Sequence, residues 1–204
     1  MALFAQALAL RAQRKQRDED RFREKQALAT SLLFKVRDMH GNYAQSRRAF
    51  EEQFAEANQR GLVDDPWRFF KPFSSNLTHF HFSPDEKATL LELKNAKLMN
   101  ETLLLEPRHY HFVESLSTLN RLIFDLIAKV PPVRVEGDSG WVELPHDEYA
   151  GLRPQMIQVN SLIEQLRTEA SEDSETYRKL VEGLAKAYKE TLHLPFAITF
   201  ENAD

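Results

Sequence analysis

The sequence predicts an all-α protein in which a long N-terminal helix packs in an antiparallel helical bundle, with an aromatic-rich loop and at most a small hairpin. Three observations lead to this fold. Residues 11–58 contain no proline and a single glycine. Residues 28–54 and 105–130 repeat apolar side chains in steps of three and four, as helices do when one face is buried. The composition, 42% hydrophobic and 28% charged, is typical of a helical protein with a real core.

The first ten residues (MALFAQALAL) are apolar. As a helix they would rise only about 15 Å, roughly half of the hydrocarbon core of a bilayer, and no basic segment precedes them as in a secretory signal. Basic residues follow instead, before any acidic one: Arg11, Arg14, Lys15 and Arg17. Such a run is expected just cytoplasmic of a membrane helix, so we predict an anionic-surface binding site there. The alternative is a solvated helix face.

Charge is divided unevenly along the chain. The first fifty residues carry 11 Lys/Arg against 5 Asp/Glu, whereas the remainder carries 16 against 26. This asymmetry indicates that the N-terminal end faces an anionic surface or an acidic partner region. Nucleic acid is not an expected partner, because Asp18, Glu19, Asp20 and Glu24 interrupt the basic run and Phe22 is the single aromatic residue within it.

Residues 11–58 predict one long helix, weakened at Gly41 and ended at Gly61, which favours a helix C-terminus. Its apolar seam predicts packing against a partner helix. The seam consists of Leu28, Leu32, Val36, Met39, Tyr43, Ser46 and Phe50, with Phe54 beside it. Before Leu28 the seam fades into charge. We therefore divide the chain into a basic amphipathic stalk or membrane-proximal helix, residues 1–26, and a helical bundle domain, residues 27–204.

An aromatic loop follows this helix. It holds Trp67, Phe69, Phe70, Phe73, Phe80 and Phe82, which we expect to plug the core under a lid. Residues 78–82 alternate as a strand does, which places Phe80 and Phe82 on one face and His79 and His81 on the other. Ser83 as N-cap, Pro84 at the first helical position and Glu86 three residues after the cap then predict a helix start.

The remaining elements are predicted from spacing and from prolines. The helix from Pro84 breaks near Asn95, and a further run follows in which Pro107 either kinks the helix or opens the next one. A second seam comprises Leu105, His109, Phe112, Leu116, Leu119, Ile123, Leu126 and Val130. Residues 133–144 favour a small hairpin or an extended loop. Helices are expected over 152–167 and 177–192, separated by a polar, acidic connector at 171–175.

Several segments resemble those of a loose group of uncharacterised bacterial helical proteins: FSPDEKATLLEL at 82–93, KLMNETLLLE at 97–106 and HYHF at 109–112. Members of this group usually have an N-terminal membrane anchor and a basic juxtamembrane helix before a leucine-rich segment. The resemblance covers about the first two thirds of the chain. It implies an architecture and not an activity, and it supplies no catalytic residues to carry over. This chain departs from the pattern because no spanning helix precedes Arg11, so either this member is soluble or the chain is a fragment.

Histidines and glutamates supply the candidate metal ligands. Three Glu-x-x-His strings join Glu106 to His109, Glu143 to His146 and Glu190 to His193. Such pairs bind two iron atoms in ferritin-like helical sites, although prolines lie in or beside all three. His79 and His81 could instead share a metal with His109 or His111. The alternative to both is a set of surface and core-edge histidines, with His109 as a satisfied core residue.

No catalytic or cofactor-binding residue is predicted. The chain has no cysteine, no glycine-rich phosphate loop and no nucleophile elbow. The leading hypothesis is a non-enzymatic helical interaction module, cytoplasmic or at the inner face of the membrane. Its partners would be another protein, a second copy through the helical seams, or an anionic membrane surface. The alternative is a metal-dependent enzyme with a Glu/His site in the bundle.

Overall fold

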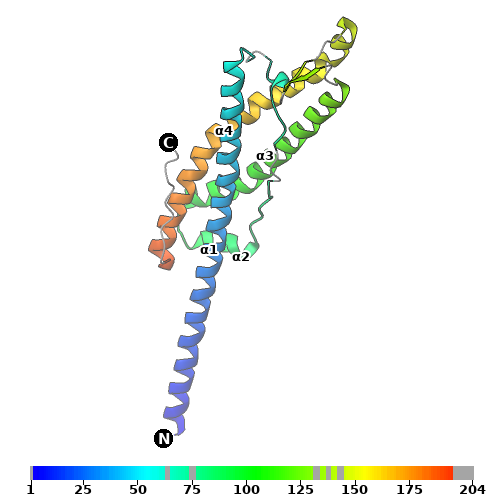
Figure 1. Ribbon diagram of the computed structural model, residues 1–204. Coiled ribbons are helices and arrows are strands. Elements are labelled where there is room, and N and C mark those ends of the chain that lie inside the picture. The colour runs from blue at the N-terminus through cyan, green and yellow to red at the C-terminus, as the bar shows by residue number, and fades with distance from the viewer. Residues whose placement is uncertain are drawn as a thin grey trace. The chain divides into compact units, whose positions relative to one another are not determined.

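The computed structural model describes residues 2–62, 65–73, 77–130, 134–136, 139–141 and 145–194 of the 204-residue chain. Only the backbone is described for residues 2–5, 7, 8, 134–136 and 139–141. The all-α prediction is confirmed. The helices are α1 (Ala2–Gln59), the short 3-10 helix η1 (Pro66–Arg68), α2 (Pro84–Leu91), α3 (Ala96–Lys129) and α4 (His146–Leu192), as Figure 1 shows. The strands β1 (Arg134–Glu136) and β2 (Ser139–Trp141) pair antiparallel in a small hairpin, with Val135 opposite Gly140.

Helix α1 is longer than predicted, because it begins at Ala2 rather than at Arg11 and continues through Gly41 without a break. It ends at Gln59, and Gly61 beyond it has a φ of +69°, which suits a residue without a Cβ atom. The amide of Leu62 donates to the carbonyl of Ala57, and the amide of Gly61 donates to that of Asn58. These two bonds satisfy the last carbonyls of the helix in a Schellman motif, as the sequence indicated.

Both predicted seams are buried. In α1, Leu32, Val36, Met39 and Phe50 have no exposed surface, whereas Leu28 at the start of the seam is half-buried. All eight residues of the second seam are buried, seven of them in α3 and Val130 directly after it. α1 packs against α3 and α4, which is the antiparallel bundle expected from two matching seams.

Helix α3 runs through Pro107, which lies in its interior. Proline costs a helix one backbone hydrogen bond and crowds the preceding turn. Burial on both sides of the proline favours continuity nevertheless, since Leu105 and Phe112 are each only 1% exposed. The predicted break near Asn95 is confirmed, because α2 ends at Leu91 and α3 begins at Ala96 with the Asn95 side chain accepting from the amide of Leu98.

The predicted connector at 171–175 is wrong. α4 is one helix of 47 residues that begins at His146 and includes this acidic segment. The reason is that the buried stripe continues through small residues, since Ala170 is 0% and Ser174 5% exposed. Buried residues at helical spacing between Leu166 and Tyr177 thus favour a continuous helix, although the polar composition of this segment favoured a break.

The backbone divides into two compact units. The first comprises Met1–His40, Phe80–Glu106 and Thr176–Asp204, and the second comprises Gly41–His79 and Pro107–Glu175. The boundaries fall inside α1, α3 and α4, so each of these helices contributes to both units. Buried side chains of the first unit include Leu32, Leu33, Val36, Leu90, Leu105, Tyr177, Val181, Leu184 and Tyr188.

In the second unit the aromatic loop covers the core, as expected. Phe70 and Phe73 pack on Phe50 of α1, with ring centroids 5.2 and 5.1 Å away. The side chain of Asn120 on α3 holds the loop by both of its groups, because it accepts from the amide of Phe73 and donates to the same residue's carbonyl. Trp67 is tied to α4 through its amide, which donates to Asn160.

Candidate functional site

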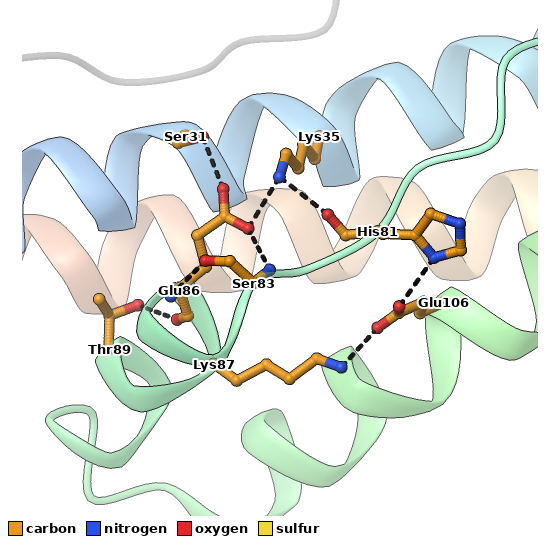
Figure 2. Close-up of polar contacts among 8 residues, drawn as sticks. All are labelled: Ser31, Lys35, His81, Ser83, Glu86, Lys87, Thr89 and Glu106. Carbon is orange, nitrogen blue, oxygen red and sulfur yellow. Dashed lines mark hydrogen bonds and ion pairs between the residues drawn. The ribbon is translucent and has the colours of Figure 1, made fainter.

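A polar cluster of the first unit surrounds Glu86 at the start of α2 (Figure 2). One carboxylate oxygen, Oε1, accepts from Ser31 at 2.6 Å. The other, Oε2, accepts from Lys35 at 2.8 Å and from the backbone amide of Ser83 at 2.7 Å. The Ser83 hydroxyl in turn accepts from the amide of Glu86, which completes the predicted capping box. Glu86 therefore caps α2 and ties it to α1.

Glu86 is only 3% exposed, yet it stays ionised. Burial alone would raise its pKa, but the hydrogen bonds from Lys35, Ser31 and Ser83 together outweigh burial, so the pKa of Glu86 is lowered. Three donors occupy the two oxygens. A carboxylate satisfied in this way is suited to holding two helices together and has little remaining capacity to bind a metal or transfer a proton.

A second carboxylate, Glu106 on α3, lies beside the first cluster (Figure 2). It accepts from Lys87 of α2 at 2.8 Å and contacts Nδ1 of His81 at 3.2 Å. Burial would raise the pKa of Glu106, but Lys87 and His81 outweigh burial and lower it. The backbone carbonyl of His81 accepts from Lys35, so the segment before α2 is held from two sides. His81 and Glu106 thus do meet, but in a polar cluster in which Glu106 also pairs with Lys87.

The other two histidine candidates lie in the second unit. His79 is half-buried and its Nε2 lies 3.1 Å from Glu114 on α3. His109 has no exposed surface, and its Nε2 lies 2.9 Å from the amide nitrogen of Asn42. Burial, with a smaller contribution from the nearby His79, lowers the pKa of His109 to about 4. His109 is accordingly a neutral core residue at physiological pH.

The described residues provide no ligand cluster that would support a metal site. Among them, no group of three or more His, Asp and Glu side chains is arranged to hold an ion. Glu106 and His109 take different partners although they are three residues apart. Glu143 lies outside the described residues, and Glu190 and His193 are both exposed at the C-terminal end of α4. His111, the other alternative ligand, is exposed on α3.

The predicted anionic-surface residues all lie on the exposed part of α1. Every residue from Ala9 to Lys25 is exposed, including Arg11, Arg14, Lys15 and Arg17. Lys15 forms one weak pair within the helix, at 3.7 Å from Glu19. The helix meets the rest of the first unit where Lys25 pairs with Glu92 at 2.7 Å and Gln26 donates to the carbonyl of Leu192. Residues 9–25, called the stalk below, are thus basic and accessible.

Sequence reasoning found the capping box of Ser83 and Glu86 but missed Ser31, Lys35 and Lys87. The missing partners lie more than fifty residues from Glu86 or pair with a different helix, so no local spacing identifies them. One signal was available. Lys35 interrupts an otherwise apolar stretch of α1, between Leu33 and Val36, and a lysine beside a buried seam needs an acidic partner.

No known protein-family model matches the chain, and no curated protein or solved structure matches it either. In the described part of the chain, none of the helices combines the length and the apolar character needed to cross a bilayer. The accessible stalk and the two polar clusters are the features of the described residues that bear on function.

Proposed function

We propose that this protein is a non-enzymatic helical interaction module, the cytoplasmic part of a membrane-associated assembly, which binds an anionic surface through its N-terminal stalk. The observation that carries the proposal is the exposure of every residue from Ala9 to Lys25 on an unbroken helix. A helix with charged residues all round normally depends on packing for its stability. Here α1 extends beyond the residues that pack, so the exposed part is available to a partner.

The charge of the stalk supports an anionic partner. Arg11, Arg14, Lys15 and Arg17 come before any acidic residue, in a chain whose net charge is −4. Each basic residue near an anionic lipid surface contributes about 1 kcal/mol, and comparable attraction acts toward an acidic protein surface. Binding of this kind weakens with salt, because the stalk is solvent-exposed and its charges are screened.

The test compares two variants of the full chain that lose equal charge. In the stalk variant, Arg11, Arg14, Lys15 and Arg17 are replaced by glutamine. In the control variant, four exposed basic residues elsewhere are replaced by glutamine: Arg48, Lys94, Arg153 and Lys186. Binding to phosphatidylserine vesicles and to poly-glutamate would be measured at low and high salt. We expect salt-sensitive binding to an anionic probe that the stalk variant loses and the control keeps. Equal behaviour of the two variants would exclude the proposal.

A metal-dependent enzyme with a Glu/His site is the alternative. The contact between His81 and Glu106 and that between His79 and Glu114 favour it, since each brings an imidazole to a carboxylate. Elemental analysis of the purified protein separates the two functions. Stoichiometric iron, manganese or zinc, lost when His81 or His79 is replaced by alanine, would favour the enzyme.

A further inference from the structure

The stalk continues the packing seam of α1 in register. Stepping back from Leu28 in threes and fours reaches Lys25, Arg21, Asp18, Arg14 and Arg11. At about 100° per residue these five positions fall within an arc of about 80° on the helix surface. That arc faces the same side as Ala29, Leu32 and Val36, which are fully buried. One face of α1 is therefore basic and exposed before Lys25, and apolar and buried after Leu28.

The opposite side of the stalk has a different charge. Glu19, Asp20 and Glu24 lie away from the seam, and Arg23 is the one basic residue that lies among them. Four of the five seam positions are basic, whereas three of these four positions are acidic. The basic residues Lys15 and Arg17 lie between the two sides. The stalk is thus an amphipathic helix in charge rather than in hydrophobicity.

A glutamate already occupies one position of this seam. Lys25 pairs at 2.7 Å with Glu92, the residue that follows α2, and the side chains of both are nearly half exposed. Phe22 and Gln26, beside it, contact His193 and the carbonyl of Leu192 at the end of α4. The end of α2 therefore approaches α1 on this face and the end of α4 approaches it beside this face. The acidic side chain of Glu92 pairs with the first basic residue of the seam that it reaches.

We propose that the seam face of the stalk from Arg11 to Arg21, with Arg14 and Asp18 between them, is the docking site for an acidic helix of a partner protein. This inference rests on the proposed function and names the anionic partner. A helix laid along this part of the seam would cover about 15 Å of α1, ahead of the contacts at Phe22 and Lys25. Glutamates at matching positions would pair with the basic residues, as charged residues beside coiled-coil seams do.

Two other occupants fit less well. A second copy of the stalk would place arginine against arginine in either orientation, which is repulsive. A flat bilayer would meet the ends of α2 and α4, which contact α1 on this same face from Phe22 onward. A helix is narrow enough to lie on the seam ahead of those contacts.

The first experiment tests the seam with a matched pair of variants. The probes are two synthetic helical peptides of alanine, glutamine and glutamate with equal composition. One repeats glutamate in steps of three and four, and the other spreads glutamate around the helix. We expect the full chain to bind the first peptide more tightly at low salt. Arg21→Glu should weaken this binding about tenfold, whereas Arg23→Glu, on the opposite side, should change it less than about twofold.

The second readout locates the bound peptide. Because the chain has no cysteine, Asp18→Cys and Gln16→Cys each introduce a single labelling site, the first on the seam and the second opposite. A fluorophore at position 18 should be shielded from an aqueous quencher when the peptide binds, and one at position 16 should not. Circular dichroism of all four variants verifies that α1 is intact.

Several outcomes would overturn the inference and leave the proposed function standing. They are equal affinity for the two peptides, equal effects of the two charge reversals, or binding to phosphatidylserine vesicles without binding to either peptide. Shielding of position 18 as the chain alone is concentrated would identify a second copy as the occupant. The proposed function itself fails only when no anionic probe binds through the stalk.

Discussion

Glu86 and Glu92 show how burial changes the contribution that a glutamate makes to stability. Both pair with a lysine of α1, at 2.8 and 2.7 Å, but the Glu86 side chain is 4% exposed and the Glu92 side chain 43%. Water screens the exposed pair, which leaves an interaction of about 1 kcal/mol or less. The buried carboxylate has given up its hydration and depends on Ser31, Lys35 and Ser83 instead.

We therefore predict that Glu86→Gln lowers the free energy of unfolding by about 2–4 kcal/mol, because it leaves Lys35 without its buried partner and weakens the cap of α2. Glu92→Gln, the matched control, should lower it by less than about 1 kcal/mol. Urea unfolding of the two variants at pH 7 measures both values. Equal losses would show that Glu86 is as well hydrated as Glu92.

His109 gives the molecule a pH-dependent stability. Its pKa is about 4 in the folded chain against an ordinary value of 6.5. Between these values the unfolded chain binds the proton and the folded chain does not. The contribution of neutral His109 to the free energy of unfolding is thus fully present above pH 6.5. It is lost as the pH drops toward 4, by up to about 1.4 kcal/mol per pH unit. Asp173, whose pKa burial raises, acts in the opposite sense.

The prediction is that His109→Gln flattens this dependence. Urea unfolding between pH 4.5 and 7 gives the slope of the free energy of unfolding against pH. In the variant this slope should correspond to up to about one proton fewer taken up on unfolding than in the parent chain. Glu86 and Glu106, with lowered pKa values, lose their contribution only in more acidic solution. A slope that the substitution leaves unchanged would mean that another group titrates in this range.

At the scale of single elements, the glycine within α1 and the glycine that follows its C-terminus differ in conformation. Gly41 lies within the helix, and a Cβ atom added there would meet nothing within 4 Å. Gly61, after the helix, has a φ of +69°, which an L-residue adopts at a cost. The same substitution is therefore favourable at one position and unfavourable at the other.

We expect Gly41→Ala to raise the free energy of unfolding by about 0.5–1 kcal/mol, because alanine restricts the unfolded chain and has the higher helix propensity. Gly61→Ala should lower it by about 1 kcal/mol. Thermal unfolding of both variants provides the comparison. Loss of stability at Gly41 would indicate that the helix opens at this residue.

The elements differ in how well the sequence predicts them, for a physical reason. The seams were predictable because large apolar residues at helical spacing report burial directly, as from Leu105 to Val130. The continuity of α4 was not predictable, because the buried residues Ala170 and Ser174 are small and Ser174 is polar, so neither one indicates burial. The same holds for the candidate site. The capping box is a local pattern, whereas the bonds from Ser31 and Lys35 to Glu86 depend on tertiary packing.

At the scale of the whole molecule, helix dominates the chain. In the part of the chain that the structure describes, the four α-helices have 58, 8, 34 and 47 residues. Circular dichroism should accordingly report well over half helix, far above the roughly one third of ordinary globular proteins. A value below about 40% in dilute buffer would contradict the fold.

Because α1 runs unbroken from the stalk into the core, the number of residues between a stalk side chain and the buried face fixes the direction in which that side chain points. One alanine inserted after Arg21 would turn Arg11, Arg14 and Arg21 by about 100° relative to the buried face and carry them only about 1.5 Å outward. Seven inserted residues would move them about 10 Å but restore their direction to within about 20°. The length of this arm is therefore free to change by heptads, while a change of one residue alters where it points.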